Sequence, residues 1–227
     1  MEPVNFFQEG QVILINKPLH WTSFDVIRKM RNIIRIKKIG HAGTLDPLAT
    51  GLLIVCTGKF TKRINEYMAA EKEYTGHIVL GATTPTYDLE SKPEHFQSYE
   101  QVTAEDMMRA VTALSGDIMQ TPPAHSAIKI EGKRVYELAR QGREVKLEKR
   151  PVTIKEFEIT SVNLPDVGFR VVCTTGTYIR SLANDFGAEI GCGAYLGSLC
   201  RTRIGNFMLE DAYNLEAFEE YARKKLS

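Results

Sequence analysis

The sequence predicts an α+β fold for this chain of 227 residues. Strand-like and helix-like hydrophobic patterns alternate irregularly along it, which favours α+β architecture over a doubly wound sheet. Hydrophobic residues make up 43% of the chain, enough for a proper core, and no internal repeat or low-complexity segment interrupts the pattern.

The first predicted elements are a strand, a capped helix and a second strand. The apolar run at 12–15 predicts a buried strand that ends at Asn16-Lys17-Pro18. Thr22, with Asp25 three residues later, predicts a helix start of the capping-box type. The apolar face of that helix is formed by Val26, Ile27, Met30, Ile33 and Ile34. The apolar run at 52–56 predicts the next buried strand.

Further along, turn-rich sequence separates shorter elements. Helices are predicted over 60–68, 103–114, 178–190 and 215–222. Strands are predicted over 74–80, 152–162 and 169–175.

The charge balance excludes a globally basic nucleic-acid binder. The formal net charge is +1 and the isoelectric point is near 7.7, so any RNA footprint must be a local patch. One candidate patch is the outer face and end of the helix after Thr22, which carries six cations and no acid. It is either an ordinary solvated helix face or a phosphate-binding surface, formed by Arg28, Lys29, Arg31, Arg35, Lys37 and Lys38.

The cysteines predict neither a zinc site nor a disulfide framework. They are scattered and form no Cys-x-x-Cys pair, at Cys56, Cys173, Cys192 and Cys200. The sequence shows no secretory signal pattern and no apolar run of membrane-spanning length. A cytoplasmic protein without a metal is therefore expected.

The most informative stretch is Gly-His-Ala-Gly-Thr-Leu-Asp-Pro-Leu-Ala-Thr-Gly at 40–51. It is a dozen residues of turn chemistry that contain one carboxylate, Asp46. Gly43 and Gly51 allow a tight loop, and Pro47 keeps Asp46 out of the helical region. Such a loop either presents a nucleophile or base, or is an Asp-Pro turn whose carboxylate bonds its own backbone.

The segment 120–150 is a second candidate for nucleic-acid contact. From His125 to Arg150 it holds eight Lys or Arg residues against four Glu, a net charge of +4. It is either a surface insertion or a basic flap that closes over nucleic acid.

These two stretches resemble the TruB family of tRNA pseudouridine synthases. Residues 40–51 resemble its catalytic motif in the bacterial form, and 120–150 resembles its RNA-gripping insertion, the thumb. Two positions depart from the family pattern: His125 stands where Tyr is usual, and His20 replaces the Gly of the N-terminal Lys-Pro-x-Gly-x-Thr-Ser motif. The resemblance extends from about Ile13 to Ala217.

The resemblance implies the catalytic residues and part of the base-binding pocket. Asp46 corresponds to the catalytic carboxylate, Tyr74 to the active-site Tyr and Arg180 to the active-site Arg. His41 corresponds to the residue that stacks where the target base leaves the RNA, and Leu199 to the residue that packs beneath that base.

Further RNA-binding residues are implied in the N-terminal motif and the thumb. They are Lys17, Pro18, Lys129, Arg134 and Arg140.

The family fold is a mixed, largely antiparallel sheet flanked by helices. The expected organisation is one catalytic domain over 1–227 with a thumb at about 120–150 and no PUA-like domain. The implied activity is isomerisation of the T-loop uridine 55 of tRNA, without a cofactor. The T-arm stem-loop is the expected partner, and a monomer with no obligate protein partner is expected.

The chemistry agrees with these residue types. Breaking the N1–C1′ bond, rotating uracil and rejoining it through C5 requires an ionised carboxylate but no redox change. A cation beside the carboxylate would keep it ionised, so we expect Arg180 to pair with Asp46. Tyr74 is expected to stack on the uracil face near C5.

Two rival functions come from other classes. A non-catalytic RNA-binding or tRNA-folding module on the same fold is the alternative, and the joint presence of Asp46, Tyr74 and Arg180 argues against it as the sole function. An Asp-nucleophile hydrolase lacks Asp-x-Asp spacing and a metal-ligand cluster in the sequence.

Overall fold

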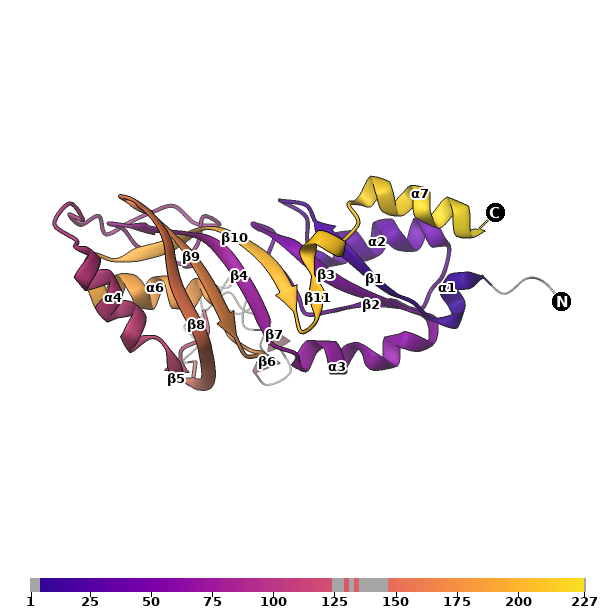
Figure 1. Cartoon of the computed structure of the whole chain (residues 1–227), viewed down its shortest axis with the longest axis horizontal. Coiled ribbons are helices and arrows are strands. Elements are labelled where there is room, and N and C mark those ends of the chain that lie inside the picture. Colours follow the sequence, from indigo (N-terminus) through magenta and orange to yellow (C-terminus); the bar gives the residue numbers. More distant parts are fainter. Residues whose placement is uncertain (1–4, 124–128, 131–132, 135–146, 227) are drawn as a thin grey trace. The chain divides into compact units, whose positions relative to one another are not determined.

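The computed structural model describes residues 5–123, 129–130, 133–134 and 147–226 (Figure 1). Contacts divide the chain into two compact units, which are described separately: unit 1 comprises 1–75 and 199–227, and unit 2 comprises 76–198. The expectation of a single domain stays a prediction.

The sheet is mixed and largely antiparallel, which confirms the predicted fold class. Its strand order is β1-β3-β10-β4-β9-β8-β5, with β2 added to β3 and β11 to β10. The pair β3–β10 is parallel, whereas β1–β3, β2–β3, β10–β11, β8–β9 and β5–β8 are antiparallel.

Unit 1 is built from both ends of the chain. Its first elements are α1 (Phe6–Glu9), β1 (Val12–Lys17), α2 (Ser23–Ile34), β2 (Ile39–Ala42), β3 (Ala49–Thr57), the 3-10 helix η1 (Gly58–Arg63) and α3 (Ile64–Ala69). Its last are β11 (Phe207–Met208), the 3-10 helix η2 (Leu209–Asp211) and α7 (Leu215–Leu226). The strands β4 (Lys72–Leu80) and β10 (Ala194–Ile204) have residues in both units.

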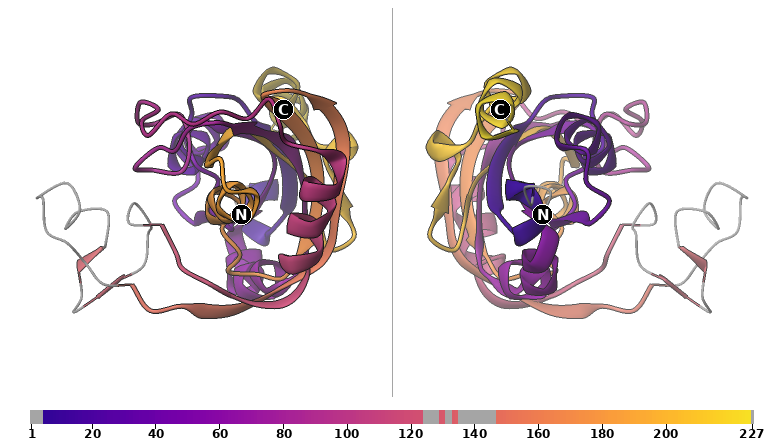
Figure 2. Two further views of the ribbon diagram at one scale, coloured as in Figure 1. Left: turned by 90° about the vertical axis from the view of Figure 1, so that its left-hand side faces the viewer. Right: turned by 90° about the vertical axis from the view of Figure 1, so that its right-hand side faces the viewer.

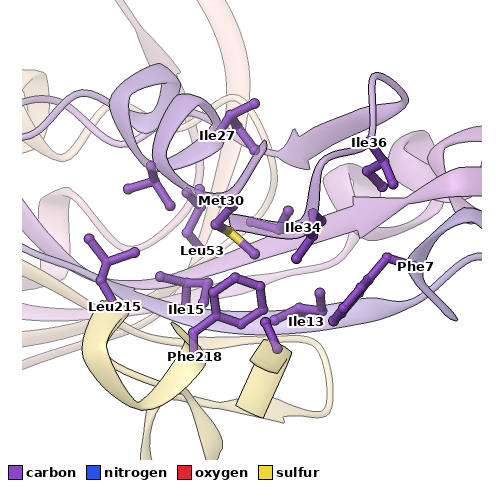
Figure 3. Packing of buried hydrophobic residues seen from close by; sticks show 13 residues of the cluster. Phe7, Ile13, Ile15, Ile27, Met30, Ile34, Ile36, Leu53, Leu215 and Phe218 are labelled. Carbon is purple, nitrogen blue, oxygen red and sulfur yellow. The ribbon is translucent and has the colours of Figure 1, made fainter. Parts of the chain in front are cut away.

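Strand β3 is the centre of unit 1 because both of its faces are buried. Leu53 and Val55 join a core in which α2 and α7 pack on β1 (Figure 3). Leu52 and Ile54 point to the other face and join a second cluster with Tyr67 of α3. A strand buried on both faces needs an unbroken apolar run, and this explains the sequence at 52–56. Each such side chain contributes about 1.5–3 kcal/mol by burial.

Helix α2 begins as the sequence predicts. The Thr22 hydroxyl accepts from the Asp25 N–H at 3.0 Å, and the Asp25 carboxylate accepts from the Thr22 N–H at 3.0 Å. This complete capping box fixes the first turn of the helix.

The described part of unit 2 contains two helices and long antiparallel strands. Its remaining elements are α4 (Ala104–Ala113), β5 (Gly116–Gln120), β6 (Lys129–Ile130), β7 (Lys133–Arg134), β8 (Arg150–Asn163), β9 (Asp166–Cys173) and α6 (Ile179–Ile190). Helices α4 and α6 lie side by side in both figures (Figure 1, Figure 2). Phe186 of α6 packs against Phe157 of β8, with ring centroids 5.8 Å apart.

The structure corrects the prediction of a long loop over 40–51. Gly40–Ala42 belongs to β2 and Ala49–Gly51 to β3, so the connection is only the six residues 43–48. The glycines at both ends of the motif occupy strands. Gly51 has φ +103° and lies opposite Lys17 on β1 and Arg201 on β10.

Other differences concern strands. The helix predicted over 60–68 is η1 followed by α3, and β2, β5 and β10 have no counterpart among the predicted elements. Strand β10 has no clear period-2 pattern because Arg201 is 1% exposed and so occupies a buried position. All four cysteines lie within the described residues and are free thiols. No helix in the described ranges combines the length and apolar character needed to span a bilayer.

Gly51 generates a stability prediction. A Cβ on Gly51 would lie 2.3 Å from the carbonyl oxygen of Arg201, at a φ that L-residues rarely adopt. We expect Gly51→Ala to lower the free energy of unfolding by about 3 kcal/mol, measured by chemical denaturation. The matched control is Gly191→Ala, at φ +90° with no atom within 4 Å of the new Cβ. It should cost only about 1 kcal/mol, and equal losses would contradict the close-approach argument.

Candidate functional site

The loop that presents Asp46 is anchored first by Ser23, at the start of α2. The buried Ser23 hydroxyl accepts from the Leu45 N–H at 2.9 Å and is 3.3 Å from the Leu45 carbonyl, to which it donates. The loop also closes on itself, because the Ala49 N–H donates to the Asp46 carbonyl at 3.0 Å. One hydroxyl therefore satisfies both backbone groups of the residue before Asp46.

The second anchor is His20. Its backbone N–H donates to the carbonyl of Pro47, the residue after Asp46, at 2.8 Å. His20 has φ +66°, in the left-handed region that glycine adopts without cost. This geometry explains why the resembling family places Gly here. His20 makes the same turn at a strain of about 1–2 kcal/mol.

The third anchor is Arg201, whose side chain is buried in unit 1. Its Nε donates to the Leu52 carbonyl at 2.8 Å and its Nη2 to the Gly43 carbonyl at 3.1 Å. A buried guanidinium requires such acceptors, and here they are main-chain groups at the start of the loop and on β3. Arg201 is not among the site residues predicted from the sequence, where its only signal is its position two residues after Leu199.

Lys17 fixes the turn that precedes α2. Its side chain is fully buried, and its Nζ donates to the carbonyls of Pro18 at 2.9 Å and Trp21 at 2.6 Å. The pKa of Lys17 is lowered from 10.5 to about 8, mainly by burial; the Asp46 carboxylate opposes this shift and the Arg201 charge adds to it. The Lys17 ammonium thus interacts electrostatically with both Asp46 and Arg201. Pro18 is half-buried and supplies one of the two acceptors.

His41 lies on β2 opposite Val55, and its ring is partly buried. Burial lowers the pKa of His41, and the positive charge of Arg201 lowers it further. The imidazole is therefore neutral at pH 7, and such a ring can stack on a base.

Leu199 and Tyr74 also belong to unit 1. Leu199 lies opposite Ala49 in the parallel β3–β10 pair, and Ala49 is the third residue after Asp46. Tyr74 is 8% exposed on β4. The residue before it, Glu73, accepts from the Thr202 hydroxyl at 2.8 Å, which places the start of β4 along the end of β10.

Arg180 lies in unit 2, on the first turn of α6, and is 5% exposed. Its Nη1 donates to the Thr86 carbonyl at 3.3 Å, and its Nε is 3.7 Å from a carboxylate oxygen of Asp88, which is also buried. Asp88 is absent from the sequence-based candidates because it lies in the turn-rich stretch 81–101. The expected pair between Asp46 and Arg180 joins residues of different units and stays a prediction.

The structure corrects the expectation of six uncompensated cations at α2. Arg28 pairs with Asp25 at 2.7 Å, and Lys29 pairs with Glu219 of α7 at 3.4 Å. The cations that follow α2 instead gather around a pocket of about 470 Å³ whose lining includes no acid. It is lined by Gln8, Arg35, Ile36, Lys37, Lys38, Gly58 and Lys59, here called the basic pocket.

The thumb residues are only partly described. Lys129 and Arg134 lie opposite each other in the β6–β7 hairpin, of which the backbone is described. Arg140 and His125 lie outside the described residues. Within the described ranges, no group of three His, Cys, Asp or Glu side chains could hold a metal ion.

Comparison with known families matches this chain to one model. Residues 31–179 match the model described as "TruB family pseudouridylate synthase (N terminal domain)". A curated relative from Flavobacterium johnsoniae, named tRNA pseudouridine synthase B, is 49% identical over 94% of this chain and 96% of its own length. A relative of the same name from Phocaeicola vulgatus is 48% identical over 95% of this chain and 94% of its own.

Solved structures of low sequence identity show the same fold. A crystal structure of a Cbf5-Nop10-Gar1 complex superposes with a TM-score of 0.74 at 30% identity, over 95% of this chain. A structure of an H/ACA RNP bound to a substrate RNA containing 2′-deoxyuridine superposes with a TM-score of 0.71 at 27% identity. The chain spans 55% and 54% of the length of these two solved chains.

Lys17 generates a pH prediction. Its pKa is about 8 in the folded protein and has the ordinary value of 10.5 in the unfolded chain. Between these values the unfolded state binds more protons, so the contribution of Lys17 to the unfolding free energy rises with pH. Below pH 8 both states are protonated and the contribution is constant. We expect wild type to gain stability relative to Lys17→Met between pH 7 and pH 10, in denaturation curves at both values. A constant difference would contradict the assigned burial.

Proposed function

The chain belongs to the TruB family of pseudouridylate synthases, and on this premise we propose that it isomerises uridine 55 in the T-loop of tRNA to pseudouridine. The observation that supports this most directly is the loop 43–48. Its two residues beside Asp46 are held by Ser23 and His20, and its start is held by Arg201. Three anchors around one carboxylate are what preorganised chemistry requires.

We propose that Asp46 is the catalytic carboxylate. The reaction breaks the N1–C1′ bond of the uridine, rotates the uracil and joins C5 to C1′; C5 then loses its proton, and N1, freed from C1′, takes up a proton. Atoms and charge balance without an oxidant or a nucleotide cofactor. Tyr74 would stack on the uracil and lie near C5, and Leu199 would form the apolar floor of the base pocket.

Extruding the uridine from folded RNA costs a few kcal/mol. His41 is proposed to stack in the space that the base leaves, and its neutral ring suits this role. Lys17 and Pro18 would act by holding the turn before α2, because the Lys17 ammonium donates hydrogen bonds to the main-chain carbonyls of Pro18 and Trp21. Arg180 is proposed to act together with Asp88, its buried neighbour.

RNA binding is proposed to use local charge, because the net charge of the whole chain is only +1. The basic pocket would hold backbone phosphates of the T-arm. The thumb cations Lys129, Arg134 and Arg140 would grip the same stem-loop. We further propose that the protein works as a monomer in the cytoplasm, where its tRNA substrate is found.

Asp46→Asn tests the proposed reaction. The substitution keeps the shape of the side chain and removes its charge, so tRNA binding should persist within about twofold while isomerisation falls by at least about 10³-fold. The measurement is single-turnover conversion of unmodified tRNA, with pseudouridine mapped at each uridine. The alternative of a binding-only module predicts no conversion by wild type. Substantial turnover by Asp46→Asn would exclude Asp46 as the essential carboxylate.

The basic pocket generates a salt prediction. Neutralising a phosphate releases counterions, so log K falls with log salt by about 0.7–0.9 for each contact. Combining Arg35→Gln, Lys37→Gln, Lys38→Gln and Lys59→Gln should reduce the slope by about 0.7–0.9 for each phosphate contact that is lost. The matched control is Lys92→Gln, an exposed lysine of unit 2 that should leave the slope unchanged. An unchanged slope in the fourfold variant would remove the basic pocket from the RNA interface.

A further inference from the structure

Two exposed apolar side chains, Phe24 and Leu19, are not used by the site described above. Phe24, in the first turn of α2, is 60% exposed, and Leu19, in the turn before that helix, is 47% exposed. The core-facing residues of α2 include Val26 and Met30, so the hydrophobic core does not account for Phe24.

The position of Phe24 connects it to Asp46. Ser23, the preceding residue, bonds both backbone groups of Leu45. His20, which follows Leu19, donates to Pro47. Phe24 and Leu19 are therefore each the immediate chain neighbour, with about 3.8 Å between Cα atoms, of a residue that contacts the residue before or after Asp46.

The backbone that carries Phe24 is preorganised. The capping box between Thr22 and Asp25 fixes the turn of helix from which Phe24 projects. The Lys17 ammonium fixes the preceding turn through the Trp21 carbonyl. An aromatic ring on such a support loses little conformational freedom when a ligand covers it.

A cation lies one helical turn from the ring. Arg28 is four residues after Phe24, so the two Cβ atoms are about 5–6 Å apart on the same face. The Arg28 guanidinium is 65% exposed and is oriented by Asp25 at 2.7 Å. An aromatic face and a guanidinium at this spacing match the base and the phosphate of one nucleotide.

We propose that Phe24 is a stacking platform for an unpaired nucleobase of the RNA, beside the uridine that enters at Asp46, with Arg28 on the backbone phosphate. This subsite rests on the proposed function and deepens it by adding a nucleotide that is bound and not modified. Leu19, 47% exposed in the turn before α2, provides a second apolar side chain. The occupant is RNA because Phe24 and Leu19 adjoin in the chain the residues that anchor the Asp46 loop, and because the exposed Arg28 guanidinium, which bonds Asp25 through one nitrogen, has further N–H groups for a phosphate.

The test is RNA affinity in the Asp46→Asn background, where binding is separated from turnover. Phe24→Ala should weaken the Kd for a T-arm stem-loop by about tenfold, the usual effect of removing one stacked aromatic. Phe24→Trp should retain affinity, whereas Phe24→Leu, which keeps apolar area but no ring, should lose most of it. The matched control is Phe96→Ala, which removes a ring that is 77% exposed in unit 2 and should bind as wild type does.

Two further measurements identify the interaction. Stacking is uncharged, so the loss in Phe24→Ala should be the same at low and high salt, whereas Arg28→Gln should reduce the salt slope by about 0.7–0.9. The second measurement uses stem-loops that carry 2-aminopurine at a single unpaired position. Binding to wild type should quench the fluorescence of the base that stacks on Phe24, and Phe24→Ala should abolish this quenching at that one position and leave the other positions unchanged.

The outcomes separate this proposal from the proposed function. If Phe24→Ala binds RNA as tightly as wild type, or if Phe24→Ala and Phe96→Ala lose equal affinity, the stacking platform is wrong. Conversion of uridine to pseudouridine by the wild-type protein would still support the proposed function in that case. A sedimentation change showing that Phe24→Ala abolishes a dimer would assign the surface to a second copy and also overturn it. Thermal unfolding near the wild-type temperature confirms that each variant is folded.

Discussion

The hydrogen bonds of the buried Arg201 guanidinium join the central strand of unit 1 to the Asp46 loop, and the arrangement of the site depends on them. The guanidinium binds the carbonyl of Leu52 in the central strand and the carbonyl of Gly43 at the start of the Asp46 loop. Burying a charge is costly unless its donors are used, so the two carbonyls and the cation stabilise one another. The same charge lowers the pKa of Lys17 and of His41. Arg201 thus connects strand β3 to the Asp46 loop and also influences the protonation of Lys17 and His41.

Much of the fold could be predicted because hydrophobic period and capping chemistry are local signals. The Thr22–Asp25 capping box, the apolar face of α2 and the doubly buried run in β3 are all visible in the sequence. Strand β10 could not be predicted, because its buried position at 201 holds an Arg that only a tertiary partner makes acceptable. The length of the Asp46 loop was overestimated because glycines such as Gly40 and Gly51 are typical of turns, whereas here both lie in paired strands and Gly51 allows a close approach to Arg201.

The site was predicted unevenly for the same reason. Asp46 is evident from its motif, and the structure adds what holds it: a hydroxyl from Ser23, a strained backbone at His20 and the Arg201 side chain. Asp88 beside Arg180 was missed because nothing in the sequence near it predicts burial. Contacts between residues distant in sequence are the information that periodicity and motifs lack. The Asp46–Arg180 pair, which came from family resemblance, remains a prediction.

The discontinuity of unit 1 has a consequence for biosynthesis. The Asp46 loop emerges from the ribosome early, but its Arg201 anchor follows more than 150 residues later, and Phe218 of the core later still. At about 5–20 residues per second, the nascent chain spends on the order of ten seconds with an Asp46 loop that lacks this anchor. The set of anchors is therefore complete only near the end of translation, and a chain interrupted before Arg201 would retain the Ser23 and His20 contacts but lack the one at Gly43.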